Sequence, residues 1–132
     1  MGKICISLDK SHIFINGSGI ILSDTFECGQ CFRWNPVEKD TYLGVVNGKV
    51  IIATQTTDGF TLEGDNIDND IEFWKNYFDL ETDYASIGKR FEKDSYIYNA
   101  AKAGQGIHIL RQDPWEVTVS FIKSANNNIT RI

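Results

Sequence analysis

The chain has 132 residues, of which 42% are hydrophobic and 23% charged, a composition that excludes a disordered segment and predicts one folded domain with its own core. The formal net charge of −5 argues against a uniformly basic surface for nucleic acid. No apolar run approaches the length of a membrane span and the Met-Gly-Lys start lacks the apolar core of a secretory signal, so we expect an intracellular, cytoplasmic protein without a membrane partner.

The basic residues are not spread evenly, and the C-terminal end of the chain is locally basic. Residues 100–132 carry four basic side chains and only two acidic ones: Lys102, Arg111, Lys123, Arg131, Asp113 and Glu116. The acidic residues gather between Asp58 and Asp83, which we interpret as a solvated face without a function of its own. The net negative charge therefore does not exclude a nucleic-acid contact near the C-terminus.

Apolar runs separated by turn residues predict strands at the start of the chain. Residues 13–15 and 20–22 flank the turn-forming sequence Asn-Gly-Ser-Gly, which predicts two strands joined by a tight turn. Residues 26–34 alternate in polarity and predict a third strand. Gly29 interrupts that alternation, which indicates a bulge or a close approach of another group to the backbone.

The dipeptide Asn47-Gly48 is the strongest hairpin signal in the sequence. It lies between the apolar segments 42–46 and 50–55, so these are predicted to pair as antiparallel strands. A further strand over residues 60–63 completes a meander.

The hydrophobic period then changes from two residues to 3.6, which predicts helices. We expect one helix from Asp68 or Asn69 to Phe78, one from about Asp83 to Lys93, and one over residues 95–103 that ends at Gly104. Strands followed by helices are typical of an α+β domain, in which helices pack on one face of a twisted antiparallel sheet.

A last helix is predicted to begin at Pro114. Asp113 can cap it, and Glu116 stands three residues later, as in a reciprocal capping box. Apolar residues recur at helical spacing, which predicts one buried side formed by Val117, Phe121, Thr118, Ile122 and Ala125. Asn126, Asn127 and Asn128 follow where the helix should end, and their amides can contact base edges or phosphates.

The remaining residues with reactive side chains have ordinary structural interpretations. Cys5, Cys28 and Cys31 are an odd number of thiols, so we expect them to be reduced, with no metal and no cofactor. Zinc binding or redox chemistry at Cys28-x-x-Cys31 stays an alternative that lacks further paired ligands. His12 and His108 are expected to be structural, and most aromatic residues are expected to lie in the core: Phe26, Phe32, Trp34, Trp74 and Phe78.

Two motifs together resemble the 8-oxoguanine DNA glycosylase family. The first is the sequence Gly-Gln-Cys-Phe-Arg-Trp over residues 29–34. The second comprises Leu-Arg-Gln-Asp-Pro over residues 110–114, Ser-Phe-Ile over 120–122 and Asn-Asn-Asn-Ile over 126–129. The resemblance covers nearly the whole chain after the first ten or so residues.

The resemblance implies a TATA-binding-protein-like amino-terminal domain of an enzyme that flips oxidised guanine out of duplex DNA, removes it, and cleaves the abasic site. In such a family Gly29 would distinguish 8-oxoguanine from guanine, because a backbone carbonyl can accept the hydrogen that oxidation places on N7. Phe32 and Phe121 would support the base pocket.

The resemblance also implies contacts with the opposite DNA strand. Asn126 would fill the gap left by the extruded base, and Asn128 would be an adjacent DNA contact. Arg131 would read the orphaned cytosine, whose pairing edge offers the acceptors O2 and N3 to a side chain that only donates. Asn127 is included with them, although consecutive side chains cannot all face one groove. The expected partner is therefore double-stranded DNA containing oxidised guanine, with the protein at the nucleoid in a bacterium.

The catalytic lysine and aspartate of this family lie in a helix-hairpin-helix region that follows the asparagine run, and no segment of this sequence resembles that region. We therefore expect residues 1–106 to form the amino-terminal α+β domain and residues 107–132 to begin a truncated helical domain, so that the chain alone is inactive. A non-catalytic DNA or nucleoside binding module is the alternative function.

Overall fold

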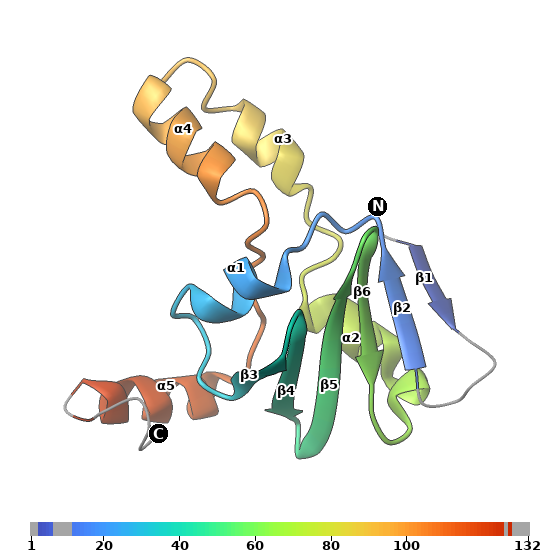
Figure 1. Ribbon diagram of the computed structural model, residues 1–132. Helices are drawn as coiled ribbons and strands as arrows, with labels where there is room; N and C mark the ends of the chain where they lie inside the picture. Colours follow the sequence, from blue (N-terminus) through green and yellow to red (C-terminus); the bar gives the residue numbers. More distant parts are fainter. Residues whose placement is uncertain (1–2, 7–11, 126, 128–132) are drawn as a thin grey trace.

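The computed structural model describes residues 3–6, 12–125 and 127. Its centre is a six-stranded antiparallel sheet with the strand order β1-β2-β6-β5-β4-β3 (Figure 1). The strands are β1 (Lys3–Ile6), β2 (His12–Asn16), β3 (Trp34–Glu38), β4 (Thr41–Val46), β5 (Lys49–Thr56) and β6 (Gly59–Glu63). The α+β fold class is confirmed.

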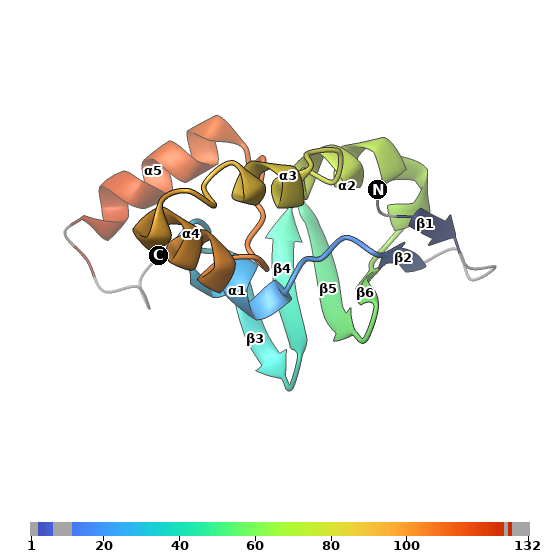
Figure 2. The ribbon, with the colours of Figure 1, turned by 90° about the horizontal axis from the view of Figure 1, so that it is seen from above.

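The helices complete the fold around one buried face of the sheet. They are α1 (Leu22–Glu27), the 3₁₀ helix η1 (Ile67–Asp70), α2 (Ile71–Tyr77), α3 (Tyr84–Lys89), α4 (Ser95–Ala103) and α5 (Pro114–Ser124). Alternate residues of the inner strands are fully buried, among them Ile13, Ile51 and Phe60, as the two-residue period of a strand requires. Figure 2 shows the helices gathered on one side of the sheet.

A cluster of aromatic rings joins α1, α2 and the sheet. Phe26 of α1 stacks on Trp34 of β3 with ring centroids 4.3 Å apart and an interplanar angle of 8°. Trp34 Nε1 donates to the hydroxyl of Tyr77 on α2 at 2.9 Å, which satisfies two buried polar atoms. Phe78 packs against Phe60 from the other side of the cluster, at 4.8 Å. The predicted core aromatics are confirmed except for Phe32, which is only half-buried.

The predicted hairpin is confirmed. Asn47 and Gly48 join β4 to β5, and both have positive φ values, 50° and 73°, as a two-residue turn that matches the strand twist requires. The strand predicted over residues 60–63 is β6, which pairs with β5 and with β2.

Two predicted strands are wrong, because residues 20–22 and 26–34 do not form them. Leu22 opens α1 instead, and Leu22, Thr25 and Phe26 are buried at helical spacing while Ile21 is exposed. The backbone N–H of Leu22, which a helix start leaves unpaired, donates to Oε1 of Gln55 at 2.7 Å. Residues 28–33 are an irregular connection and only Trp34 begins a strand.

The later helices follow the sequence prediction with shifted ends. Asp83 accepts a hydrogen bond from the Ser86 N–H and caps α3, but this helix ends at Lys89, before the predicted Lys93. Helix α4 has the predicted bounds. No residue of α3 or α4 is buried, and the two helices project together away from the sheet (Figure 1). In the part of the chain that the structure describes, no helix has the length and apolar character to cross a membrane.

The packing of Trp34 predicts the effect of a methyl group at Gly44, its partner on β4. A Cβ at Gly44 would lie within 2.7 Å of three atoms of the Trp34 ring, so Gly44→Ala should lower the free energy of unfolding by about 1 to 3 kcal/mol. The matched control is Gly88→Ala in α3, where a Cβ meets nothing within 4 Å and alanine favours the helix. Urea unfolding measures both, and an unaffected Gly44→Ala variant would contradict this packing.

Candidate functional site

The connection between α1 and β3 holds Gly29 in an unusual backbone conformation. Its φ of +91° lies in the region that side chains disfavour, and the residue is exposed. A Cβ at this position would meet nothing within 4 Å, so the glycine is required here by its backbone geometry and leaves open space beside it. The bulge predicted at Gly29 is wrong, because the glycine lies in a loop. An open approach to its backbone remains.

This loop, residues 28–33, folds back over the C-terminal end of α1. The Cys28 thiol donates to the Thr25 carbonyl at 3.4 Å, and the Cys31 thiol donates to the Phe26 carbonyl at 3.3 Å. Gln30 Nε2 also donates to the Thr25 carbonyl, at 2.8 Å. These donors satisfy carbonyls that the end of a helix leaves unpaired.

The same loop is joined to the segment that leads into α5. Gln30 Nε2 donates to the carbonyl of His108 at 2.8 Å, and Gln30 Oε1 accepts from the N–H of Leu110 at 2.9 Å. Gln112 Nε2 in turn donates to the backbone carbonyl of Gln30 at 2.6 Å. Our sequence interpretation gave Gln30 no role, since its partners lie about 80 residues further along the chain and no local pattern indicates them.

Thr25 and His108 continue this junction into the core. The buried Thr25 hydroxyl donates to the Gly106 carbonyl at 3.0 Å and accepts from the His108 N–H at 3.3 Å. His108 Nδ1 lies 3.0 Å from the Phe78 carbonyl, and its ring stacks on Tyr84. Burial lowers the pKa of His108, which keeps the imidazole neutral. This histidine is structural, as predicted.

Helix α5 contacts the loop of residues 28–33, the Gly29 loop, in two further places. The rings of Phe32 and Phe121 pack edge to face with centroids 4.9 Å apart, so the structure brings these two predicted site residues together. The Arg33 guanidinium lies 3.2 Å from the Glu116 carboxylate. Asp113 caps α5 by accepting from the Glu116 N–H at 2.8 Å, as predicted, whereas the Glu116 carboxylate pairs with Arg33.

The apolar side predicted for α5 is not buried. Val117 is half-buried, but Ile122 is 69% exposed, and Trp115 on the first turn is 76% exposed. Within the described residues, α5 extends away from the sheet beyond its contact with Phe32, so little protein covers it (Figure 1). The prediction of a buried face is therefore wrong for this structure.

The asparagine run begins where α5 ends. Asn127 is exposed, and its Nδ2 donates to the Lys123 carbonyl at 3.2 Å, in the last turn of the helix. The other predicted DNA contacts, Asn126, Asn128 and Arg131, lie outside the described residues.

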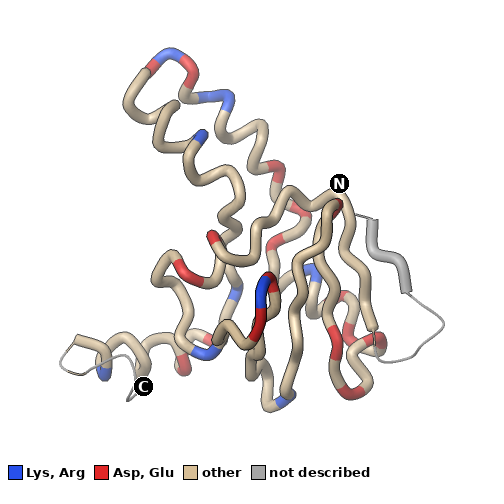
Figure 3. The backbone as a smooth tube through the Cα atoms, viewed as in Figure 1, with Lys and Arg blue, Asp and Glu red and all other residues tan. Residues whose placement is uncertain are grey.

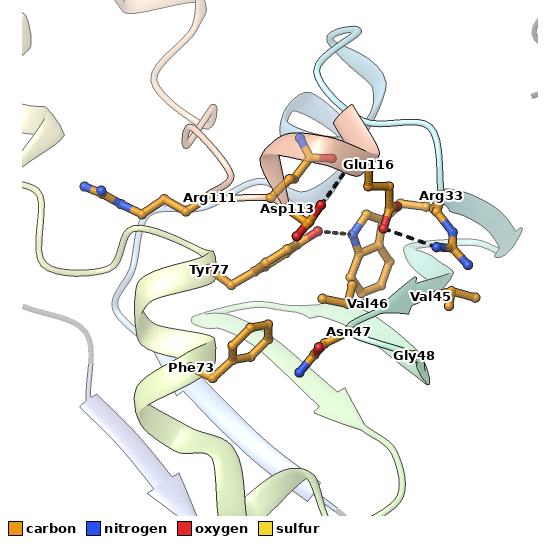
Figure 4. Close-up of a pocket in the computed structure, with 12 residues that line it drawn as sticks. Arg33, Val45, Val46, Asn47, Gly48, Phe73, Tyr77, Arg111, Asp113 and Glu116 are labelled. Carbon is orange, nitrogen blue, oxygen red and sulfur yellow. Dashed lines mark hydrogen bonds and ion pairs between the residues drawn. The ribbon is translucent and has the colours of Figure 1, made fainter. Parts of the chain in front are cut away.

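A cavity of about 390 Å³ lies next to the start of α5 (Figure 4). Trp34 and Tyr77, which are joined by a hydrogen bond, are among its lining residues, and so are Arg33 and Glu116, which form an ion pair. Burial raises the pKa of Tyr77, so its hydroxyl stays neutral and remains bonded to Trp34. Gly29, Phe32 and Phe121 do not line this cavity.

Cys31, two residues after Gly29, is held as a thiol by its surroundings. Burial, with a contribution from Cys28, raises the pKa of Cys31 to about 12, which disfavours the thiolate that nucleophilic or metal chemistry needs. Both cysteines are free. Among residues 3–6, 12–125 and 127, no three His, Cys, Asp or Glu side chains are placed to hold a metal ion.

Arg111 fixes the path of the chain before α5. Its backbone N–H donates to the Tyr77 carbonyl at 2.9 Å, and its guanidinium donates twice to Asp79 Oδ1, at 2.9 and 3.1 Å. The Tyr84 hydroxyl donates to Asp79 Oδ2 at 2.7 Å. Burial would raise the pKa of Asp79, but the hydrogen bonds from Tyr84 and Arg111 outweigh it and lower that pKa.

Comparison with known proteins places the chain in a family. The family described as "8-oxoguanine DNA glycosylase, N-terminal domain" matches residues 12–118. The N-glycosylase/DNA lyase of Saccharomyces cerevisiae is 34% identical over 96% of this chain, and an Arabidopsis thaliana N-glycosylase/DNA lyase is 28% identical over 82%. This chain spans 37% of the yeast protein and 31% of the plant protein.

Solved structures show the same fold. The apo form of Clostridium acetobutylicum 8-oxoguanine glycosylase/lyase is 35% identical, with a TM-score of 0.84 over 98% of this chain and 45% of its own. The same enzyme bound to double-stranded DNA with cytosine opposite 8-oxoguanine gives a TM-score of 0.83 at 35% identity, over 98% of this chain and 44% of that one. The chain therefore belongs to the 8-oxoguanine DNA glycosylase amino-terminal domain family.

The bonds of Asp79 predict a pH-dependent contribution to stability. Asp79→Asn should lower the free energy of unfolding by about 1 to 2 kcal/mol at pH 7, because Arg111 loses its charged partner. Asparagine suits the positive φ of 50° at this position, so the backbone should be preserved.

The sign of the pH dependence follows from the lowered pKa. The carboxylate stabilises the fold fully above the unfolded-state pKa of about 4, and this contribution is lost as the pH falls through the lower folded-state value. The difference between the parent chain and Asp79→Asn in urea unfolding should therefore shrink below about pH 4. The exposed Asp65→Asn is the control, and an equal effect of the two substitutions at pH 7 would contradict the role of Asp79.

Proposed function

We propose that this chain is the lesion-reading part of an 8-oxoguanine DNA N-glycosylase and abasic-site lyase, acting on double-stranded DNA that contains oxidised guanine. The observation that carries the proposal is the junction of the Gly29 loop with α5, through Gln30, Phe32 and Arg33. It brings the loop that holds Gly29 into contact with α5 and with the segment that leads into it. Residues 1–106 would be the α+β part of the enzyme, and residues 107–132 the start of its helical part.

Gly29 would read the oxidised base. The N7 of 8-oxoguanine carries a hydrogen that a backbone carbonyl can accept, whereas the N7 of guanine presents a lone pair to the same carbonyl. Two acceptors facing each other in a dry pocket lose about 1 to 3 kcal/mol, which corresponds to a preference of about fivefold to 150-fold. The open space beside Gly29 supports this role, since it leaves room for a base. Phe32 and Phe121 would back the loop.

The end of α5 would contact the DNA around the flipped base. Asn126 would fill the stack, Asn127 and Asn128 would contact the strand nearby, and Arg131 would donate to O2 and N3 of the orphaned cytosine. The exposed Trp115 and Ile122 leave the outer surface of α5 open to a further protein or DNA surface. The complex of the Clostridium acetobutylicum enzyme with cytosine opposite 8-oxoguanine supports this choice of partner.

The chemical step would be completed by residues outside these 132. Schiff-base chemistry requires a lysine whose pKa is lowered by burial or by a neighbouring positive charge. Lys123, the lysine nearest the asparagine run, is exposed at the end of α5. It lacks the environment of such a nucleophile.

Borohydride trapping tests the division of labour. Incubated with a duplex containing 8-oxoguanine opposite cytosine, the 132-residue chain should form no covalent adduct, because base removal and imine formation need the absent lysine. A complete 8-oxoguanine glycosylase/lyase serves as the positive control on the same duplex. An adduct with this chain would place a nucleophile within it, and failure to bind the duplex at all would remove the proposed role in recognition.

Substitution of Arg131 tests the reading of the opposite base. Arg131→Ala should reduce the preference for cytosine over adenine opposite the lesion by about tenfold, the effect of losing a bidentate hydrogen bond. Arg90→Ala is the matched control, since Arg90 lies between α3 and α4, near a tip where Figure 3 shows both basic and acidic residues. Both variants lose one positive charge. For each variant the ratio of dissociation constants compares the duplex with cytosine and the duplex with adenine opposite the lesion, and because these duplexes carry the same charge, a general electrostatic loss cancels in that ratio. An unchanged ratio in Arg131→Ala would refute the role of Arg131.

A further inference from the structure

The side chain of Gln30 has an unusually complete set of partners. Its Nε2 donates to the carbonyls of Thr25 and His108, both at 2.8 Å, and its Oε1 accepts from the Leu110 N–H at 2.9 Å. Both amide hydrogens and the carbonyl oxygen are thus used, each by the backbone. The residue joins the end of α1 to the segment 108–112 that leads into α5.

Gly29 itself has little to hold it. It is exposed, has no side chain, and stands in a conformation with φ of +91°, so its position depends on the residues bonded to it. Gln30 is its covalent neighbour, and Gln112 adds a hydrogen bond to the Gln30 carbonyl at 2.6 Å. The side chain of Gln30 and its own carbonyl, which belongs to the next peptide, are therefore both held, one residue after the Gly29 carbonyl.

We propose that Gln30 is a positioning residue for base discrimination, which sets the place of the Gly29 carbonyl relative to the start of α5. This inference rests on the proposed function of Gly29. Discrimination by one carbonyl requires that the carbonyl stays at hydrogen-bonding distance from N7, since a shift of about 1 Å removes the bond to the oxidised base and relieves the repulsion of guanine. Gln30 supplies the fixed support that an exposed glycine lacks.

Three variants of this chain separate the role of the amide from its bulk. Gln30→Met keeps the length of the side chain and removes all three hydrogen bonds. Gln30→Glu keeps the acceptor for Leu110 but replaces the donor with a carboxylate oxygen that faces two carbonyls. Gln105→Met is the matched control, because Gln105 is exposed in the turn after α4.

The first measurement is amide hydrogen exchange of the free chain at Leu110, compared between variants that retain the parent circular dichroism. Exchange should become about tenfold faster in Gln30→Met, because the Leu110 N–H loses its acceptor, and should be unchanged in Gln105→Met. Gln30→Glu should retain most of the protection. Unchanged exchange in Gln30→Met would show that Gln30 does not hold the Leu110 N–H, and it would overturn the proposal whatever the DNA measurements give.

The second measurement is the ratio of dissociation constants for duplexes that differ only in guanine or 8-oxoguanine opposite cytosine. Gln30→Met should reduce this ratio by about fivefold to tenfold, while Gln105→Met leaves it unchanged. In Gln30→Glu the ratio should recover as the pH falls, since protonation of the introduced carboxyl restores one donor to the carbonyls. This rescue would show that the ratio depends on a donor at this position and not on the bulk of the side chain.

The outcomes distinguish the inference from the function on which it rests. Faster exchange at Leu110 together with a parent ratio in Gln30→Met would overturn the positioning role. If the parent chain itself binds both duplexes equally, the proposed function of Gly29 fails in this chain and the positioning role fails with it. The exchange measurement still decides whether Gln30 holds the segment 108–112. If Gln30→Met does not fold, Gln30→Glu decides, and a ratio in that variant that stays at the parent value at every pH would overturn the proposal.

Discussion

The fold around the candidate site depends on a small set of polar contacts between two segments about 80 residues apart in sequence. Thr25 and Gln30, on α1 and the loop after it, bond to the backbone of Gly106, His108 and Leu110. These groups are buried or half-buried, so an unpaired one would lose much of its hydration without replacement. Together with the bonds of Arg111 to Tyr77 and Asp79, these contacts fix the path of the chain from α4 to α5.

This polar junction explains why α5 can stand in a defined place with so little apolar burial. Beyond the contact of Phe32 with Phe121 and the ion pair of Arg33 with Glu116, the large apolar side chains of Trp115 and Ile122 are exposed. Hydrogen bonds are directional, so a few of them orient a helix that packing alone would leave free to shift. The arrangement suits a site in which one exposed glycine and the end of one helix must keep a fixed separation.

Local signals predicted much of the fold, because their causes lie within a few residues. Asn47 and Gly48 form a tight hairpin turn because they tolerate the positive φ values that this turn requires. Asp113 caps the first turn of α5, which begins at the next residue. Helix α1 was not predicted, because an apolar run over residues 20–22 fits a strand equally well. The first backbone N–H of α1, that of Leu22, is satisfied by the side chain of Gln55 from β5. The choice between helix and strand was made by a distant residue.

The residues of the candidate site were likewise predicted only in part. Gly29, Phe32 and Phe121 were predicted through the family resemblance, and the structure places Phe32 on Phe121 and Gly29 in the same loop. Gln30 was not predicted, because a glutamine beside a glycine has no distinctive local pattern and its partners are backbone groups that only the tertiary fold brings near. The burial expected for α5 failed for a related reason: helical periodicity shows which side is apolar and does not show what covers it.

We propose that the Gly29 loop and the end of α5 act as one lesion-reading surface. The most direct test is to follow backbone amide shifts of the labelled chain as it is titrated with a duplex carrying one 8-oxoguanine opposite cytosine, and with the same duplex carrying guanine. The shifts at Gly29, Gln30 and residues 124–131 should be larger with the oxidised duplex. Equal shifts with the two duplexes, or shifts confined to the α3–α4 hairpin, would contradict it.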